Sequence, residues 1–311
     1  MIRFRCIVAL CLCLATSASG ARAADETPEW QRHRPKVPGT LRLHLRERRV
    51  EVGQVRVIER TADWEVAETA IIVCDMWDDG FCRAPVQRVG VMVPRMNEVL
   101  WAARDHGVMV IHAPSTVMNV YADDPQRLRM KRTEPVEPPV PIRSWCPLDA
   151  DREPPPVGRE GLFPFETKIG GCDDPVPAPM VRRYSRQHSG LDIAGFDGIS
   201  DQGGEIFSYC RRQGIKNIAI MGISTNVCVL SRSFGIRQLV RLGFQVALVR
   251  DLTDVMYDPR QPPYVSHARG TELIVEHIEA YWCPSIESGD LTNTVPGTAG
   301  PVSGHGPQER R

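Results

Sequence analysis

The chain has 311 residues, of which 42% are hydrophobic, so it is long enough for one large domain or two small ones with a sizeable core. Its 38 basic and 38 acidic residues leave no formal net charge. It therefore lacks the basic excess typical of nucleic-acid-binding proteins and the charge runs that hold proteins at membrane surfaces.

The first 23 residues have the pattern of an export signal. Arg3 and Arg5 precede an apolar run over residues 6–15, and small residues follow up to Ala23. The apolar run is too short to span a bilayer. We therefore predict an exported protein, periplasmic or extracellular, that is free of the membrane once the signal is removed. A retained N-terminal anchor is the alternative.

An N-terminal extension is predicted over residues 24–68. Residues 24–40 are polar and contain prolines, which is typical of a poorly ordered segment. Apolar and polar residues then alternate between positions 41 and 59, as in half-exposed strands. The pattern predicts a small antiparallel β extension before the main domain.

The main domain is predicted at residues 69–284. It starts with a buried strand over residues 69–75, an apolar run that ends in an acid. A helix with one apolar face follows at residues 91–106, and an apolar strand at residues 108–113 comes after the glycine that ends the helix.

The same unit of helix, glycine and buried strand recurs twice. Helices ending at Gly214 and Gly243 lead into apolar runs at residues 215–221 and 244–249, and a last helix is predicted over residues 266–281. This alternation indicates an α/β fold with a doubly wound, mainly parallel sheet, right-handed crossovers and helices on both faces. The arrangement is Rossmann-like.

Three further segments lack clear periodicity. Residues 134–180 contain twelve prolines and are predicted to form a long loop, either a lid over the site or an insertion without contact to it. A third core strand is expected near residues 182–193, although their composition is poor for a strand. Residues 285–311, rich in glycine, proline, serine and threonine, are predicted to form a disordered tail.

The chain has ten cysteines, and three of them lie in the predicted signal. Seven remain, so at least one thiol cannot pair within the chain. The cysteines in or beside predicted loops are candidates for disulfides in an oxidising compartment, namely Cys82, Cys146, Cys172 and Cys283. Cys74 and Cys210 occupy predicted core positions. No cysteine or histidine cluster has the spacing of a zinc site.

Cys228 is the candidate nucleophile. Residues 217–243 are interpreted as a strand, a tight turn, Cys228 and a helix, which places the thiol at a helix N-terminus. Unpaired amides and the helix dipole would lower the pKa of a thiol there, so that thiolate would form near neutral pH. The alternative is that Cys228 is a small buried residue of the core.

Other reactive groups are predicted at the same edge of the sheet, where the carboxyl ends of parallel strands meet. Asp75 ends the first strand and is the candidate base, while Asp251 ends a later strand and is a candidate pocket residue. The backbone N–H groups of Ser224 and Cys228 are candidates for an oxyanion hole. The sequence has no phosphate-binding glycine motif, so no nucleotide cofactor is expected.

Two segments resemble a known family. Ile-Ile-Val-Cys-Asp-Met-Trp-Asp-Asp at residues 71–79 and Met-Gly-Ile-Ser-Thr-Asn-Val-Cys-Val at residues 221–229 are similar to the signature segments of the isochorismatase-like cysteine hydrolases. Residues 75–78, 111–115, 250–259 and 266–267 resemble a secreted subgroup.

The resemblance implies a six-stranded parallel sheet, an oligomer, and a catalytic triad of Asp, Lys and Cys. Asp75 matches the acid of the triad and Cys228 the nucleophile. A cis peptide in the nucleophile turn would join Ile223 and Ser224.

The lysine of the triad has no counterpart at the end of the third strand. Lys216 precedes the strand that leads to the nucleophile and is expected to point away from the site. Lys168 lies in the proline-rich loop, where a solvated position is expected. Arg183 or Arg186 could instead supply a fixed positive charge, although a guanidinium does not release a proton as an ammonium can.

Metal-dependent relatives, the nicotinamidases, carry an Asp-x-His sequence and a further histidine after the second strand. Here that strand ends at His112 and the next histidine is His188, so no metal is expected. His112 is either a substrate-pocket residue or a hydrogen-bonded residue at a strand end. Trp77 is either an aromatic wall of the pocket or packed beneath the lid.

The leading hypothesis is a cysteine-dependent hydrolase of a small amide or carbamoyl compound, with an acyl-enzyme on Cys228 and Asp75 as base. One alternative is an isochorismatase-type vinyl-ether hydrolase, whose chemistry does not need the cysteine. Another is a non-catalytic small-molecule-binding protein on the same fold. We expect a homo-oligomer with a small-molecule substrate, no cofactor and no nucleic-acid partner.

Overall fold

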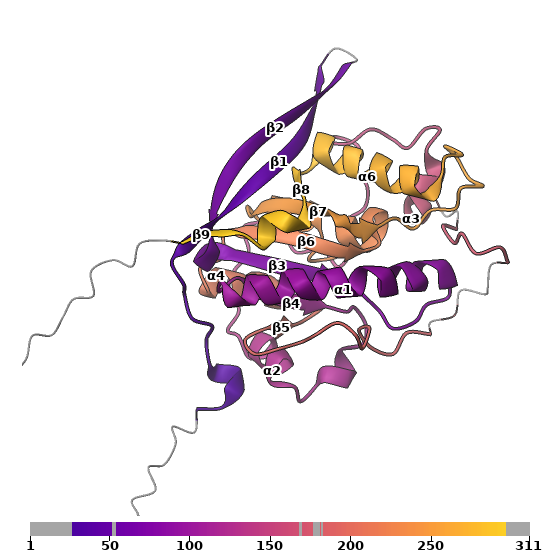
Figure 1. Ribbon diagram of the computed structural model, residues 1–311. Coiled ribbons are helices and arrows are strands. Elements are labelled where there is room, and N and C mark those ends of the chain that lie inside the picture. The colour runs from indigo at the N-terminus through magenta and orange to yellow at the C-terminus, as the bar shows by residue number, and fades with distance from the viewer. Residues whose placement is uncertain (1–26, 52–53, 168–169, 177–180, 182, 297–311) are drawn as a thin grey trace, which may run out of the picture.

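The computed structural model describes residues 27–51, 54–167, 170–176, 181 and 183–296 (Figure 1). The predicted export signal at residues 1–23 lies outside these ranges. Within them, no helix combines the length and the apolar character needed to cross a membrane.

Six parallel strands form the centre of the molecule, in the spatial order β8-β7-β6-β3-β4-β5. Numbered along the chain and read from β5, this is the order 3-2-1-4-5-6 of doubly wound dinucleotide-binding folds. The predicted α/β class is thus confirmed, and the six parallel strands are part of a larger sheet of nine strands among the described residues. The strands are β3 (Thr69–Cys74), β4 (Met109–Ala113), β5 (Gly198–Ile199), β6 (Asn217–Ile223), β7 (Gln245–Asp254) and β8 (Ser285–Ile286).

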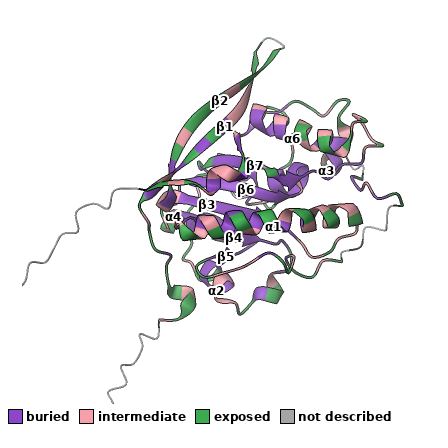
Figure 2. Ribbon diagram, in the orientation of Figure 1, coloured by how far each residue is buried: buried purple, intermediate pink, exposed green. Residues whose placement is uncertain are grey.

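Helices cover both faces of this sheet (Figure 1). One face packs against α1, whose buried side chains meet alternate residues of the strands. The other face packs against α4, α5 and α6. The central strands are buried on both sides, as Figure 2 shows. The helices are α1 (Arg83–Asp105), α2 (Pro125–Lys131), α3 (Pro164–Thr167), α4 (Gly203–Arg212), α5 (Ile236–Arg241) and α6 (His267–Tyr281).

Short 3-10 and π turns connect these elements. The 3-10 turns are η1 (Glu29–Gln31), η2 (Val66–Glu68), η3 (Met118–Tyr121), η4 (Glu160–Leu162) and η6 (Ser288–Leu291), and the π turn is η5 (Thr225–Val229). Only η5 bears directly on the site described below.

Helix α1 begins at Arg83, eight residues before the predicted start at residue 91. Its first free N–H groups, those of Arg83 and Ala84, donate to the carboxylate of Asp174 at 2.8 and 2.9 Å. A side chain from a distant loop therefore caps the helix. Sequence periodicity does not report such a cap, because the capping residue is remote in the chain.

The predicted β extension is a long antiparallel hairpin of β1 (Gly39–Glu51) and β2 (Gln54–Glu65). Strand β1 also pairs with β8 and with β9 (Thr294–Pro296), so the extension continues the edge of the main sheet. The hairpin projects from the body of the molecule (Figure 1), and β2 is largely exposed (Figure 2).

Two predictions about core strands are corrected. Residues 183–193 contain no strand; the edge strand β5 lies later and has only two residues. Residues 285–296 are not a disordered tail, because they form β8, η6 and β9, and Ser285 and Ile286 are fully buried. Residues 297–311 lie outside the described part. A strand of two residues is too short to show a hydrophobic period in the sequence. Such strands are recognised only by the backbone pairing with their neighbours in the sheet.

The proline-rich loop is largely irregular, as predicted, and is tied to the domain by a buried arginine. Arg237 of α5 is fully buried and forms ion pairs with Glu153 (2.8 Å) and Glu166 (3.2 Å) of the loop. It also donates to the carbonyl oxygen of Cys146 at 3.0 Å. These contacts hold the loop over the carboxyl ends of the strands.

Candidate active site

The candidate site lies between β3 and β6, where the strand order reverses. Asp75 follows β3, and Ser224 and the turn η5 follow β6, the parallel neighbour of β3. A crevice at such a switch point is the usual ligand site of an open parallel sheet. The structure thus brings Asp75 and Cys228, which are 153 positions apart in sequence, to one point.

Asp75 is held in a conformation that few residues other than glycine adopt, with φ at 48°. Its side chain is fully buried. The backbone N–H of Ser115 donates to Oδ1 at 2.7 Å, and Nε of Arg232 donates to Oδ2 at 3.1 Å. The thiol of Cys228 is a third partner. All three contacts aim the carboxylate at the nucleophile turn.

The nucleophile turn requires a glycine. Gly222 has φ at 113°, and a side chain there would collide with the carbonyl oxygen of Cys74 on β3. The two strands can approach this closely only without a Cβ atom. The next peptide, Ile223–Ser224, is cis, as the resemblance implied.

The side chain of Asn226 anchors the same turn to two other segments. Its side-chain amide donates to the carbonyl oxygens of Leu162 and Met256, both at 2.8 Å, and its Oδ1 accepts the N–H of Met256 at 2.9 Å. Three segments are therefore locked together, namely the proline-rich loop, the turn and the chain beyond β7. Such a rigid support fixes the direction of the thiol.

Cys228 lies within η5 and not at the start of a long helix. The helical segment breaks soon after η5, and α5 begins only at Ile236. Burial raises the pKa of the Cys228 thiol strongly, and the adjacent Asp75 carboxylate raises it further. Arg232 and the N–H of Ser224 act in the opposite sense but do not compensate. The pKa shift is therefore opposite to the predicted lowering, because burial and the Asp75 carboxylate both favour the thiol over the thiolate.

The pKa of Asp75 is also raised, again because of burial. Arg232, the Cys228 thiol and Ser115 oppose this shift. A carboxylate with a raised pKa that accepts a hydrogen bond from a thiol is a suitable acceptor for its proton. The pair can therefore exchange one proton without releasing it to solvent.

Among the residues that the structure describes, Arg232 is the positive group of the site. The prediction of Arg183 or Arg186 is wrong, because both are exposed and neither lines the cavity described below. Burial disfavours the charge of Arg232, but Cys228 and Asp75 outweigh it and raise its pKa, so the guanidinium stays charged. Arg232 lies four positions after Cys228, the spacing of neighbours on one helix face, and that spacing was the available signal.

The lysine that precedes β6 does not serve the site. Lys216 pairs with Glu68 at 2.6 Å before the start of β6, at the end of the strand away from Cys228. Lys168 lies outside the described residues. Among the described residues, the cation beside Asp75 and Cys228 is therefore the guanidinium of Arg232, on the nucleophile segment itself.

A cavity of about 440 Å³ opens above Cys228. Trp77 lines it and stacks on Tyr184 with ring centroids 4.3 Å apart. Trp145 and Phe165, from the proline-rich loop, line it from another segment. The loop is therefore in contact with the site, and Trp77 is part of an aromatic wall.

Two predicted pocket residues lie elsewhere. His112 is fully buried beneath the site, where its ring nitrogens contact Gln187 at 3.0 Å and Asp197 at 3.2 Å. It is the hydrogen-bonded strand-end residue of the two alternatives. Asp251 does not line the cavity, and its carboxylate accepts the N–H of Ser288 at 2.8 Å. Strand β7 continues past it to Asp254, so Asp251 is not at the strand end.

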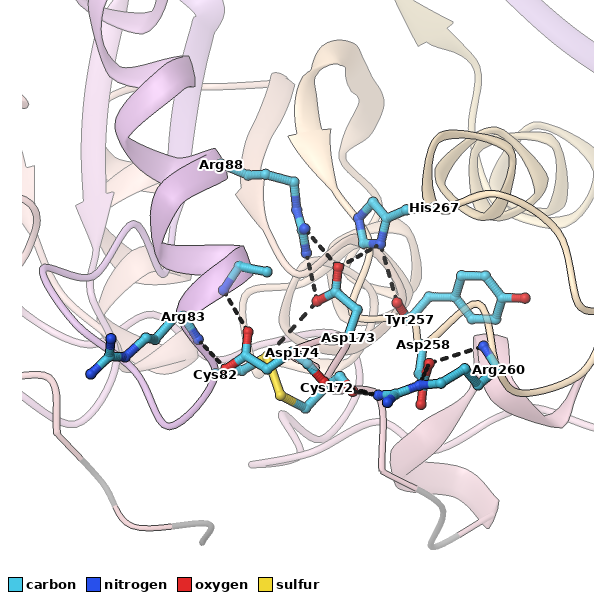
Figure 3. Close-up of a disulfide and its surroundings, with 11 residues drawn as sticks. Cys82, Arg83, Arg88, Cys172, Asp173, Asp174, Tyr257, Asp258, Arg260 and His267 are labelled. Atoms are coloured by element: carbon cyan, nitrogen blue, oxygen red, sulfur yellow. Dashed lines mark hydrogen bonds and ion pairs between the residues drawn. A yellow bond between two sulfur atoms is a disulfide. The ribbon is translucent and has the colours of Figure 1, made fainter. Parts of the chain in front are cut away.

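A disulfide joins Cys82, at the cavity wall, to Cys172 of the proline-rich loop (Figure 3). Beside it, Arg88 of α1 bridges Asp173 and Asp254, with contacts of 2.8 and 2.7 Å. The cavity wall and the loop are thus fastened together by a covalent bond and by ion pairs.

The other cysteines of the described chain are free. Cys146 and Cys283, the remaining disulfide candidates, are buried thiols, and Cys74 and Cys210 lie in the core as predicted. Cys82, Cys172 and Asp174 come close enough together to hold a metal ion. The two sulfur atoms are bonded to each other, however, and a disulfide does not provide thiolate ligands.

The sequence matches no protein-family model and no curated protein. Solved structures similar to this chain include a cysteine hydrolase from Pseudomonas syringae, with 18% identity over 73% of this chain and 92% of that one, and a TM-score of 0.42. An isochorismatase family protein from Burkholderia thailandensis has 17% identity over 72% and 93%, with a TM-score of 0.40.

A third similar structure is N-carbamoylsarcosine amidase from Thermoplasma acidophilum, with 10% identity over 71% of this chain and 96% of that one, and a TM-score of 0.33. The solved structures similar to this chain thus include cysteine hydrolases, isochorismatase-family proteins and an amidase. Identities and TM-scores this low do not transfer an activity to this chain.

Proposed function

We propose that the chain is an isochorismatase-like cysteine hydrolase that cleaves the C–N bond of an amide through an acyl-enzyme on Cys228. One observation carries the proposal: a buried thiol, a carboxylate and a guanidinium are hydrogen-bonded or ion-paired to one another at the base of a cavity. This is the combination of nucleophile, base and fixed charge that acyl transfer needs.

In the first step Sγ of Cys228 attacks the carbonyl carbon as its proton passes to Asp75. The C–N bond then breaks, and Asp75 returns that proton to the nitrogen of the leaving ammonia or amine. A water molecule next attacks the thioester and gives one proton to Asp75. The carboxylic acid is released, and the sulfur recovers the proton from Asp75.

Arg232 stabilises the charge that moves between these two groups. Its guanidinium interacts with both the Asp75 carboxylate and the Cys228 sulfur, so either can bear the negative charge during the cycle. A fixed cation suffices for this task, because Asp75 alone carries the proton. The absence of the family lysine therefore does not argue for loss of catalysis.

The oxyanion hole is proposed at the backbone N–H groups of Ser224 and Cys228. The N–H of Ser224 is directed at the sulfur of Cys228, so a carbonyl bound to that sulfur would lie close to it. Amide groups in this position stabilise the oxyanion of a tetrahedral intermediate.

The two alternatives are less well supported. A vinyl-ether hydrolase acting on isochorismate would have to bind carboxylates, but Arg232, the cation among the described residues of the cavity wall, is already paired with Asp75. A binding protein without activity does not need a thiol and a carboxylate in hydrogen-bond contact in its interior. Both features favour amide chemistry.

We also propose export, as the sequence predicts. The Cys82–Cys172 disulfide supports it, since such bonds persist in oxidising compartments. The homo-oligomer expected from the sequence remains a prediction, which sedimentation of the purified protein can check.

Intact-mass spectrometry after incubation with a panel of amides tests the proposal. We expect an acyl adduct on the protein and release of ammonia or amine, with both lost in Cys228→Ala. Cys210→Ala, which removes a buried thiol that does not line the cavity, is the matched control and should keep the adduct. Turnover that persists in Cys228→Ala would refute the mechanism.

A further inference from the structure

The described residues that line the cavity above Cys228 offer little to a charged ligand. Among the described residues that line it, the charged ones are Asp79 and Arg232. Arg232 is ion-paired with Asp75 at 3.1 Å. Asp79 is exposed and accepts the N–H of Gly80 at 2.7 Å. Burying an uncompensated charge is costly, so a charged substrate would be disfavoured here.

Two aromatic pairs dominate the rest of the wall. Trp77 and Tyr184 stack with an interplanar angle of 14°, and Trp145 and Phe165 meet at 49° with centroids 6.2 Å apart. Aliphatic side chains line the space between them, among them Val86, Val89, Val227 and Met256. Walls of this kind bind apolar rings through burial and through stacking or edge contacts.

The size of the cavity excludes a good fit for the smallest amides. Its volume of about 440 Å³ lies within the roughly 300–1,000 Å³ that drug-sized ligands occupy. An amide such as acetamide would leave most of the aromatic wall without contacts. The wall could then contribute nothing to binding the transition state.

Resting on the function proposed above, we propose that the substrate is an uncharged carboxamide with a bulky apolar ring group on its acyl side. Trp145 and Phe165, both from the proline-rich loop, determine this specificity. The acyl group is assigned to the aromatic wall because it alone takes part in both acylation and deacylation. Contacts with it can lower both barriers, whereas contacts with the leaving amine can lower only the first.

Phe165 is the better of the two residues for a test. The guanidinium of Arg232 lies 5.7 Å from the ring centroid of Trp145, so a change at Trp145 would also disturb the charged group. Phe165 is 51% exposed, so its truncation should cost little stability. Val157 is 81% exposed on the same loop and does not line the cavity, which makes Val157→Ala the matched control.

The experiment measures kcat/KM for four amides with the wild type and the two variants. The four amides are acetamide, naphthylacetamide, the carboxylate-bearing analogue of naphthylacetamide, and N-naphthylacetamide, which carries the ring on the leaving amine. We expect kcat/KM for naphthylacetamide to be at least about 100-fold higher than kcat/KM for acetamide. It should also be at least about 10-fold higher than kcat/KM for the carboxylate-bearing analogue. Phe165→Ala should reduce the first ratio about tenfold, while Val157→Ala keeps it.

Two outcomes overturn this inference and leave the hydrolase function standing. One is equal kcat/KM for acetamide and naphthylacetamide, with both activities lost in Cys228→Ala. The other is a preference for N-naphthylacetamide, which would place the ring on the leaving group.

Binding to Cys228→Ala separates the two proposals. If naphthylacetamide binds this variant by calorimetry at least about tenfold more tightly than acetamide, while the wild type cleaves none of the amides, the ligand class stands and the hydrolase function fails. Equal, weak binding of both amides would overturn the ligand class.

Discussion

Two buried carboxylate–arginine pairs occupy neighbouring parts of this molecule, and they have opposite electrostatics. Asp75 pairs with Arg232 in the site, and Glu153 pairs with Arg237 beneath the proline-rich loop. Both carboxylates have no exposed side-chain surface, and the two arginines are five residues apart. Burial raises the pKa of each acid. The pKa of Asp75 nevertheless ends above its ordinary value, and that of Glu153 falls to about 2.

The number and strength of hydrogen-bond donors explain the difference. The carboxylate of Glu153 accepts hydrogen bonds from Nη2 of Arg237 at 3.0 Å, from the ring of His277 at 2.6 Å and from the N–H of Asp149 at 2.9 Å. Asp75 has one arginine contact, one backbone N–H and a thiol, which is a weak donor. A saturated carboxylate stays ionised and anchors the loop, while an under-saturated one can accept a proton.

The largest expected effect is a loss of activity when Asp75 is replaced, with no comparable loss when Glu153 is replaced. Asp75→Asn should lower kcat on the order of 10⁴-fold, because the thiol loses its proton acceptor. Glu153→Gln should leave kcat close to that of the wild type and lower the thermal midpoint instead. Ammonia release and differential scanning calorimetry measure the two effects. A large loss of kcat in Glu153→Gln at a temperature where the variant is folded would contradict the division of roles.

The second prediction concerns the anchoring pair. Arg237→Met should lower the free energy of unfolding by about 3–5 kcal/mol, because Glu153 would be left buried without its cation. Urea denaturation followed by circular dichroism measures the change. In the double variant Arg237→Met, Glu153→Gln the loss should be smaller, since the orphaned charge is gone. Additive losses in the double variant would show that the two side chains act independently.

The third and smallest effect is a pH shift caused by Arg232. This residue lowers the pKa of Asp75, so Arg232→Met should raise that pKa further. The base would then ionise only at higher pH, and the acid limb of kcat/KM should move to higher pH. The loss at low pH should be on the order of 10²-fold.

Arg232→Lys is the matched control for this shift, because it restores a cation and the ammonium of the family pattern. Its acid limb should lie closer to that of the wild type than the limb of Arg232→Met. An unchanged profile in Arg232→Met would remove Arg232 from the proton-transfer chemistry.

Much of the fold was predictable because strand and helix periods are local. The buried strands β3, β4, β6 and β7 are continuous apolar runs that follow turns or glycines. Strands β5 and β8 have two residues each and carry no such signal. They exist because longer neighbours offer them backbone partners, so only the assembled sheet defines them.

The candidate site was predictable to the same extent. Asp75 directly follows a buried strand, Cys228 follows another after a short turn, and parallel strands end at a common edge. Arg232 was missed because the positive group was sought near the end of the third strand, where the resemblance places the lysine, and not one helical turn after Cys228. His112 and Asp251 also follow or occupy strands, but His112 is turned into the core and Asp251 lies within a longer strand.

The sequence by itself determined the order of the long strands and of the main helices between them, and it placed an acid and a thiol at one edge of the sheet. Both follow from patterns within short stretches of chain. The tertiary structure decided the charge states, the cavity and the cation. The proton affinity of Asp75 depends on burial, on the N–H of Ser115 and on Arg232, groups that are distant in the sequence and that only the folded chain brings together.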